Sequence, residues 1–354
     1  MNALRRVRSL AACALMLLAG TTAGAATSGP QLAQTVARSL VGSPAPRLVL
    51  KTIDGATIDL GDLYGKKAVY LKFWATWCTP CREQMPHLEH TFESAGSDLA
   101  VIAIDVGFGD SLEAIRAYRQ HSGIRMPIVF DEDGHLGAAF GLRVTPQHIV
   151  IGRDGRIRYI GHLADAQLDA ALRTATALST ETAAAAAPGG RVPDEAPHFT
   201  LGDALPAQSV SLIDGAAFTF QPAKAQRPTV LVFLSPWCES YLATTRPTVA
   251  ANCRNVREQL NARARDPRVR CLGIASGLWA MPEDLRKYRV DYKVAMPLTL
   301  DASGTLFREF RVNDVPTVIV ADGSGRIVQR FEPNDTKALQ RELATLYGAQ
   351  GAAH

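Results

Sequence analysis

The chain has little of several features that define whole classes of protein. It contains six cysteines among 354 residues, too few for a small fold held together mainly by disulfides. Charged residues make up 20% of the chain and apolar residues 47%, which excludes a disordered acidic chain and a collagen-like one. Beyond the N-terminal segment no stretch reaches 18 apolar residues, so we expect a protein that does not itself span a membrane.

Clustered basic charge is also missing. Residues 40–177 carry 14 basic and 16 acidic side chains, and residues 191–354 carry 20 and 17. A nucleic-acid surface needs basic residues gathered on one face, so no nucleic-acid partner is expected. Three arginines of the N-terminal segment account for most of the formal charge of +4.

Residues 1–25 have the pattern of a signal peptide. Three arginines precede an apolar run over residues 10–20, and Ala23-Gly24-Ala25 predicts cleavage before Ala26. Cys13 imitates a lipoprotein box, but the apolar run follows it instead of preceding it, which argues against lipidation. We therefore expect a periplasmic or otherwise extracytoplasmic protein, in a compartment where cysteine pairs are bridged or redox-active.

The rest of the chain divides into two similar parts, residues 40–177 and 191–350. Residues 178–190 (LSTETAAAAAPGG) between them have the composition of a linker. Residues 126–157 align without gaps with 296–327, and twelve of these 32 pairs are identical. Chance gives roughly two identities, so the pattern indicates an internal duplication.

Each part alternates strands with helices, which predicts an α/β fold with a mixed β-sheet flanked by helices in each domain. In the first part, Asp154-Gly155 is a hairpin turn signal between the last two strands. The expected strands are residues 68–74, 99–104, 147–151 and 157–160, and the expected helices include 111–122 and one through Met85, Leu88 and Phe92.

Cys78-Thr79-Pro80-Cys81 lies between a predicted strand and the helix that follows it. A helix N-terminus favours a thiolate at Cys78, and Cys81, one turn later, can attack a mixed disulfide. The pair is sufficient for thiol–disulfide exchange and needs no other cofactor. The alternatives are a static disulfide or part of a metal site.

A zinc site is not expected, because it needs about four ligands and the chain has no second CxxC. His87 and His90 share a helical face but are expected to be solvated. Copper(I) binding by the reduced CxxC is the better metal alternative.

Four motifs follow one another in the first part of the chain. They are GSPAP at 42–46, FWATWCTPCR at 73–82, Val144-Thr145-Pro146 and Asp154-Gly155-Arg156-Ile157. These motifs, in this order, resemble the TlpA/ResA-like branch of the thioredoxin superfamily, and the resemblance covers residues ~40–162. It implies a thioredoxin fold, Cys78 as nucleophile, Cys81 as resolving thiol and a cis Pro146 beside them. It also implies protein disulfides as clients, the reductive direction and a membrane electron-transfer protein as donor.

Several residues are expected to tune this site. Trp77, Pro80 and Thr145 flank the cysteines and the proline. Many family members carry Glu where this chain has Gln84, and thioredoxin's buried Asp falls at Lys72. We hypothesise that Lys72, charged or as a neutral base, tunes Cys81 in place of these carboxylates. The alternative is a Lys72 that points to solvent and has no role.

The sequence predicts that the second part is a degenerate copy of the first, in which the CxxC pair is incomplete. Tyr241 stands where Cys81 stood, so Cys238 lacks a CxxC partner, while Pro316 keeps the proline-loop position. Cys238 could be an inert relic, a residue that holds a client as a mixed disulfide, or a peroxidatic thiol. The peroxiredoxin signature Pro-x-x-x-Thr-x-x-Cys is absent before it and before Cys78, which argues against a thiol peroxidase.

Cys253 and Cys271 then remain. Fifteen residues of continuous helix would place Cys253 about 22 Å from Cys238, so a direct bridge between these two cysteines would require the helix to break, for example at Pro247. Cys271 begins the next strand, at the end of the sheet opposite to Cys238. A continuous helix would reach that end of the sheet near Cys253. We therefore predict a structural Cys253–Cys271 disulfide; two buried free thiols are the alternative.

Together these features predict an exported thiol–disulfide oxidoreductase whose second domain binds or positions partners. A non-catalytic protein that binds clients or copper(I) is the alternative.

Overall fold

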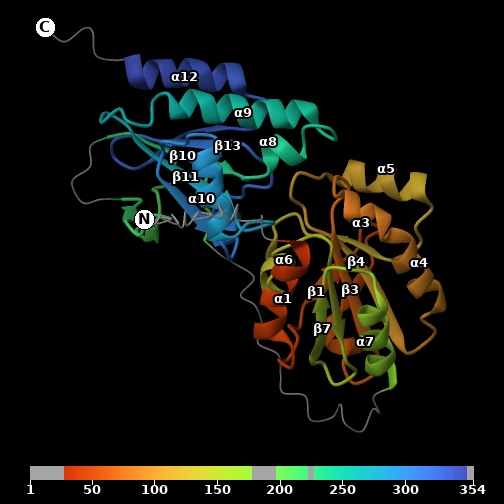
Figure 1. Cartoon of the computed structure of the whole chain (residues 1–354). Coiled ribbons are helices and arrows are strands. Elements are labelled where there is room, and N and C mark those ends of the chain that lie inside the picture. The colour runs from red at the N-terminus through yellow and green to blue at the C-terminus, as the bar shows by residue number, and fades with distance from the viewer. Residues whose placement is uncertain (1–27, 178–196, 222–226, 349–354) are drawn as a thin grey trace, which may run out of the picture.

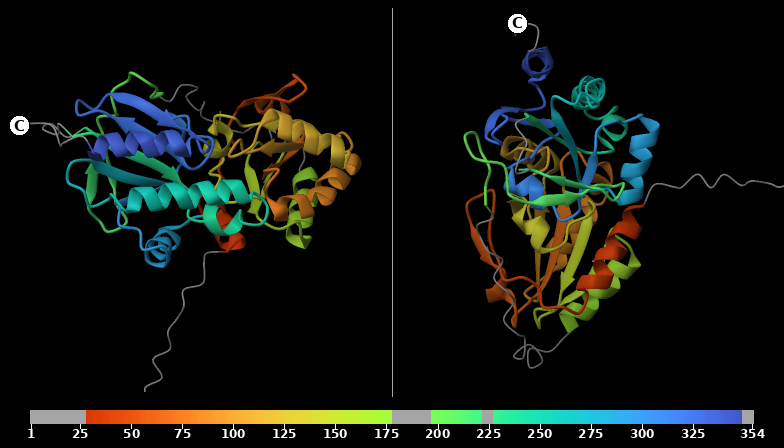
Figure 2. Two further views of the ribbon diagram at one scale, coloured as in Figure 1. Left: turned by 90° about the horizontal axis from the view of Figure 1, so that it is seen from above. Right: turned by 90° about the vertical axis from the view of Figure 1, so that its left-hand side faces the viewer.

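The computed structural model describes residues 28–177, 197–221 and 227–348. The predicted signal peptide, residues 1–25, and the predicted linker, residues 178–190, lie outside the described residues. The described residues form two α/β units placed side by side (Figure 1; Figure 2).

The first unit has a five-stranded mixed sheet of order β5-β4-β3-β6-β7. β4 runs parallel to β3 and β5 parallel to β4, whereas β6 pairs antiparallel with β3 and β7 antiparallel with β6. Its elements are α1 (Gly29–Leu40), β1 (Val49–Lys51), β2 (Thr57–Asp59), α2 (Leu60–Leu63), β3 (Ala68–Trp74), α3 (Thr79–Glu83), α4 (Met85–Ser94), β4 (Leu99–Asp105), α5 (Leu112–Ser122), β5 (Ile128–Phe130), α6 (His135–Ala139), β6 (Gln147–Ile151), β7 (Ile157–Gly161) and α7 (Ala166–Ala177).

The second unit repeats this plan, with a five-stranded mixed sheet of order β12-β11-β10-β13-β14. In Figure 1, α9 and α12 run side by side over one face of this sheet, and α10 lies on the other. Its elements are β8 (Ser209–Ser211), β9 (Ala217–Thr219), β10 (Thr229–Leu234), α8 (Cys238–Tyr241), α9 (Pro247–Asn261), β11 (Arg270–Ser276), α10 (Pro282–Asp291), β12 (Leu298–Asp301), α11 (Thr305–Glu309), β13 (Thr317–Ala321), β14 (Ile327–Phe331) and α12 (Thr336–Gly348).

The predicted α/β class with mixed sheets is confirmed. The central strand β3 is buried along its whole length, as expected for a strand covered by helices on both faces. Helix α5 starts where the Ser111 side chain accepts the Ala114 N–H, and it ends at Gly123, whose φ of 70° is accessible to glycine.

The register of the two sheets reproduces the internal duplication. Tyr70 of β3 pairs with Val101 of β4, and Val230 of β10 pairs with Cys271 of β11. Positions in β10 are therefore 160 residues beyond their equivalents in β3, and positions in β11 are 170 beyond those in β4. These two offsets identify the equivalent residues of the two units.

No helix within the described ranges is both long enough and apolar enough to cross a membrane.

Candidate active site

Cys78 and Cys81 form a disulfide directly after β3, with their Cα atoms 5.2 Å apart. Cys78 is the N-cap of α3, and its sulfur accepts the Cys81 N–H at 3.3 Å. Thr79 and Pro80 occupy the first two helical positions, where the missing N–H of proline costs no helical hydrogen bond. In the dithiol state the same N–H would stabilise a Cys78 thiolate.

The loop of Thr145 and Pro146 ends where β6 begins, on the strand that pairs with β3. Phe73 of β3 lies opposite Gln147, so the register brings Pro146 to the sheet edge from which the CxxC segment leaves. The Thr145–Pro146 bond is cis, as the resemblance implies. The Pro146 carbonyl accepts a hydrogen bond from His162 Nδ1 at 2.8 Å.

Lys72 is fully buried on β3, which excludes the alternative that it points to solvent. Its Nζ donates to the Cys81 carbonyl at 3.2 Å. Burial lowers the pKa of Lys72 from 10.5 to about 7, because a charged amine is poorly solvated there. The lysine can therefore change its charge near neutral pH within reach of the resolving cysteine.

Next to Lys72, the side chains of Tyr70, His148 and Gln84 form a hydrogen-bonded chain. His148 lies opposite Lys72 on β6, and its Nε2 is 2.8 Å from Gln84 Oε1. The Tyr70 hydroxyl lies 2.7 Å from His148 Nδ1. Because the amide oxygen can only accept, His148 donates through Nε2 and accepts from Tyr70 through Nδ1. Burial, and then the charge of Lys72, hold the pKa of His148 well below its usual value.

Sequence reasoning missed His148, His162 and Tyr70. A signal was available for His148, since it is a polar residue in the otherwise apolar strand QHIVI. Its role depends on the pairing of β6 with β3, which the sequence does not specify. Gln84, predicted as a tuning position, links the two histidines because its Nε2 also donates to the His162 carbonyl at 3.4 Å.

Comparisons with known proteins match this first unit. Residues 41–160 fit the AhpC/TSA family model. ResA of Bacillus subtilis (strain 168), a thiol-disulfide oxidoreductase, is 32% identical over 33% of this chain and 64% of its own length. The thioredoxin-like protein YneN of the same organism is 34% identical over 43% of this chain and 87% of its own. The chain belongs to the TlpA/ResA-like thiol–disulfide oxidoreductases.

Among solved structures, a thioredoxin-family thiol:disulfide interchange protein from Chlorobium tepidum TLS is 27% identical. The match covers 38% of this chain and 95% of that one, with a TM-score of 0.34.

The second domain of this oxidoreductase has a disulfide other than the predicted one. Cys238 is bridged to Cys253, with a Cα–Cα distance of 6.4 Å, and Cys271 is a buried thiol. The prediction of a Cys253–Cys271 bridge is therefore wrong. Cys238 has a partner sulfur, which contradicts the interpretations of it as a holder of a mixed disulfide without a resolving thiol and as a peroxidatic thiol; the interpretation as an inert relic stays a prediction.

The reason is a break in the helix. α8 ends at Tyr241 and α9 begins at Pro247, so Cys253 lies only seven residues into α9 instead of fifteen residues down a continuous helix. Cys253 therefore stays at the proline-loop end, where its sulfur is 3.8 Å from the Val315 carbonyl oxygen. The Val315–Pro316 bond is cis, like its counterpart in the first domain. Burial raises the pKa of Cys271 to about 12, so it remains a thiol.

The two domains meet through their active-site edges. The Trp77 ring stacks on Trp237 with centroids 5.3 Å apart. Each indole donates to its own domain's loop, Trp77 to the Phe108 carbonyl and Trp237 to the Leu278 carbonyl. Phe108 and Leu278 are 170 residues apart, so these contacts are equivalent in the two copies.

The loops also exchange main-chain hydrogen bonds. Gly109 N–H donates to the Asn313 carbonyl at 2.6 Å, and Trp279 N–H donates to the Arg143 carbonyl at 2.8 Å. Gly109 and Trp279 are equivalent positions, and so are Arg143 and Asn313. The domains are therefore related like subunits of a two-fold dimer, in which one patch pairs with its own copy.

Trp279 breaks this symmetry. Its backbone φ of 56° is uncommon for a residue with a side chain. Its indole N–H donates to Thr145 Oγ1 at 3.1 Å, so the second domain occupies the polar edge of the Thr145-Pro146 loop. Tyr241, in the place of a cysteine, accepts the Thr79 N–H at 3.2 Å. Cys78, next to Thr79, is only 1% exposed.

An ion pair strengthens the same interface. Arg246, between α8 and α9, contacts the buried carboxylate of Asp110 at 3.1 Å. The guanidinium also donates to the Gly109 carbonyl and to Thr76 Oγ1. Asp110 in turn accepts the Thr76 N–H at 2.7 Å, two residues before Cys78. The arginine of the second domain is thus coupled to the segment that carries the CxxC.

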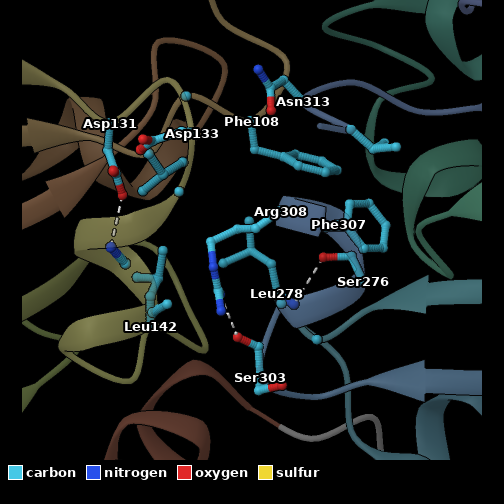
Figure 3. Close-up of a pocket in the computed structure, with 18 of the residues that line it drawn as sticks. Phe108, Asp131, Asp133, Leu142, Ser276, Leu278, Ser303, Phe307, Arg308 and Asn313 are labelled. Carbon is cyan, nitrogen blue, oxygen red and sulfur yellow. Dashed lines mark hydrogen bonds between the residues drawn. The ribbon is translucent and has the colours of Figure 1, made fainter. Parts of the chain in front are cut away.

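A cavity of about 240 Å³ lies between the domains (Figure 3). Phe108 and Leu142 line it from the first domain, and Leu278 and Phe307 from the second. Arg308 also lines it, but its guanidinium is satisfied by the Ser303 carbonyl at 3.1 Å. The interface is therefore incompletely packed. Separating the two domains breaks fewer apolar contacts than it would at a close-packed interface.

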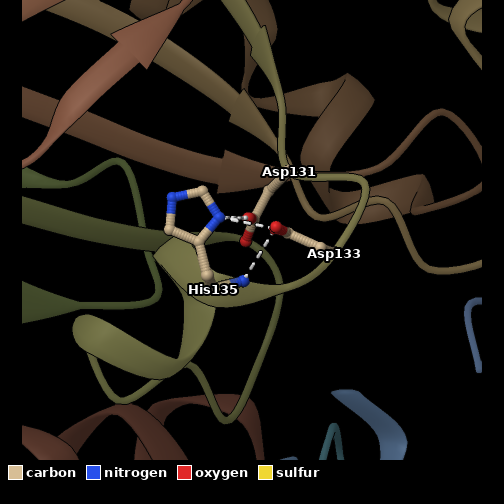
Figure 4. A group of neighbouring side chains, drawn as sticks. All are labelled: Asp131, Asp133 and His135. Carbon is tan, nitrogen blue, oxygen red and sulfur yellow. Dashed lines mark hydrogen bonds and ion pairs between the residues drawn. The ribbon is translucent and has the colours of Figure 1, made fainter. Parts of the chain in front are cut away.

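Asp131, Asp133 and His135 lie close enough to share a cation (Figure 4). The Asp131 carboxylate, however, accepts two backbone N–H groups at the start of α6, including that of Gly137 at 2.7 Å. Asp301 of the second domain accepts the equivalent N–H of Phe307, although Ser303 and Thr305 stand at the positions of Asp133 and His135. The aspartate therefore serves to hold the helix in both copies.

Proposed function

We propose that this protein is an exported protein-disulfide reductase that uses Cys78 and Cys81. The observation that carries the proposal is the Cys78–Cys81 disulfide at the start of α3, facing the Thr145-Pro146 loop above a buried lysine. The family supports thiol–disulfide exchange as the chemistry. The apolar segment after three arginines at the N-terminus supports export.

In the proposed cycle, the Cys78 thiolate attacks one sulfur of a client disulfide. A Cys78–client mixed disulfide forms, and the other client sulfur leaves as a thiolate. Cys81 then attacks the Cys78 sulfur, which releases the second client thiolate and regenerates the Cys78–Cys81 disulfide. Two electrons pass to the client, and a membrane electron-transfer protein restores the dithiol.

We assign the second domain to client binding and positioning. A cavity of about 460 Å³ opens beside Trp77, and its lining includes five aromatic residues of the second domain. Such rings bind the side chains of an extended polypeptide at low entropic cost. The domain must also withdraw Trp279 before a client can use the Thr145-Pro146 edge. The aromatic residues of the lining are Trp77, Trp237, Tyr241, Trp279, Tyr288 and Tyr292.

The decisive experiment compares reduction of a model protein disulfide by the wild type and by Cys78→Ser. We expect steady turnover by the wild type with a dithiol donor and only background with the variant. An inactive wild type would reject the enzyme and favour a non-catalytic client- or copper(I)-binding protein. Cys81→Ser should accumulate the mixed disulfide, which identifies the client covalently in the native compartment.

A further inference from the structure

The second disulfide occupies the place in its domain that the CxxC disulfide occupies in the first. Cys238 follows Trp237 at the end of β10, as Cys78 follows Trp77 at the end of β3. Cys253 supplies the partner sulfur from α9, next to the loop that carries Pro316. A bridge that served only to link distant elements would have no reason to occupy this position.

The two residues of this bridge differ in their exposure. Cys253 is 8% exposed, whereas Cys238 is 0% exposed. Cys253 is also more exposed than Cys78, which is at 1%. The position equivalent to Trp279 is Gly109, which brings no side chain toward the Pro316 loop. The second disulfide is therefore slightly less covered than the first.

A small cavity adjoins Cys253 and is also lined by Ser235, Arg257 and Pro316. Ser235 is 3% exposed, and among the described residues its hydroxyl has no hydrogen-bond partner. Buried hydroxyl groups are ordinarily paired, so this one is available to a group that approaches Cys253. Arg257 is held at the rim by Glu239, at 2.6 Å.

We propose that Cys238–Cys253 is a second redox-active disulfide, which accepts electrons from a dithiol donor. A donor thiolate attacks the Cys253 sulfur, forming a donor–Cys253 mixed disulfide and releasing Cys238 as a thiolate. The second donor thiol attacks the donor sulfur of that bond and releases the Cys253 thiolate. The donor is oxidised to its disulfide, and the Cys238–Cys253 pair gains two electrons.

The test uses the wild-type mature chain, so that both pairs are measured in one sample. The protein is equilibrated in a series of reduced and oxidised glutathione mixtures, quenched with acid and differentially alkylated. Peptides containing each cysteine are then quantified by mass spectrometry. A brief native labelling pulse on Cys271, which is buried, reports any unfolding.

We expect at least half of Cys238–Cys253 to be reduced in the mixture that fully reduces Cys78–Cys81, with Cys271 still protected. A Cys238–Cys253 bridge that stays mostly oxidised there, or opens only when Cys271 becomes labelled, overturns the proposal. That result leaves the function of Cys78–Cys81 untouched, because the two pairs are read separately.

Two single variants test which sulfur is attacked. Cys238→Ser leaves Cys253 as the thiol, and Cys253→Ser leaves Cys238. With oxidised glutathione, we expect Cys253 to form the mixed disulfide at least about tenfold faster than Cys238, because access controls the rate. Equal rates would overturn the assignment of Cys253 as the attacked sulfur.

Discussion

The two domains share a sheet, a proline loop and a tryptophan–cysteine step, but they differ beneath the sulfurs. In the first domain Lys72 and His148 face each other across β3 and β6. Their equivalents in the second domain are Val232 and Val318, which pair in the same register. At these two positions the first domain therefore carries the cost of burying ionisable groups, and the second domain does not. We therefore predict that Lys72 and His148 tune chemistry specific to the Cys78–Cys81 pair.

The domains also differ in where the second cysteine comes from. Cys81 is three residues from Cys78, whereas Cys253 is fifteen from Cys238. The position that Cys81 would occupy in the second copy is Tyr241, which instead contacts Thr79 across the interface. The second domain therefore has a contact with the first domain where the first domain has its resolving cysteine.

The largest expected effect is on stability, through Lys72→Met. The pKa of Lys72 is about 7 in the fold and 10.5 as the ordinary value. The fold therefore bears the full penalty of a buried charge below pH 7, and the penalty fades as pH rises toward 10. We expect Lys72→Met to raise the free energy of unfolding by roughly 3 kcal/mol at pH 6 and by less at pH 9.

Chemical denaturation at the two pH values measures this gain. Val232→Met changes the equivalent position of the second domain and should give no comparable pH dependence. An equal gain from Lys72→Met at both pH values would contradict a titrating Lys72.

The next effect concerns the cover over the first disulfide. Trp279→Ala removes the indole hydrogen bond to Thr145, together with the packing of the ring. A loss of about 1–2 kcal/mol of interface energy corresponds to roughly tenfold faster opening. We therefore expect the reduced protein to show about tenfold faster alkylation of Cys78.

Trp279→Phe keeps an aromatic ring but lacks the N–H group, so it should fall between the wild type and Trp279→Ala. Stopped-flow labelling followed by peptide mapping gives both rates. A Cys78 that reacts at the wild-type rate in Trp279→Ala would mean that the second domain does not limit access.

A third expectation links Lys72 to the thiols themselves. A positive charge nearby favours a thiolate, so Lys72→Met should raise the pKa of the Cys78–Cys81 thiols by about one unit. The difference from wild type should be largest below pH 7, where Lys72 is charged, and should shrink above it. Thiolate absorbance against pH measures this directly, and exchange at Cys238–Cys253, above valines, should not change.

The smallest effect is expected for Cys271→Ala. Cys271 is buried and unbridged, so its removal leaves a small cavity and costs about 1 kcal/mol. The redox titrations of both disulfides should remain as in the wild type. A shift in either would show that Cys271 exchanges with a bridge.

Local signals were sufficient for much of the fold. The strand at 68–74 and the helix cap at Ser111 follow from apolar runs, periodicity and capping chemistry, all short-range properties. The CxxC was equally visible because its residues are contiguous. The Cys238–Cys253 bridge was set aside because it required the helix to break near Pro247, and the structure has this break, five residues long, between α8 and α9. This break keeps Cys253 close to Cys238. The spacing of apolar residues alone does not show whether the helix is continuous or broken there.

The sequence by itself determined that the chain holds two copies of one α/β plan and that one copy carries a contiguous cysteine pair, because duplication and motif are written in neighbouring residues. Only the tertiary structure decided that Lys72 lies beneath Cys81 beside His148, that Cys238 is bridged to Cys253, and that Trp279 covers the first active site. Each of these contacts joins residues far apart in the chain, so it depends on strand register, helix breaks and domain packing.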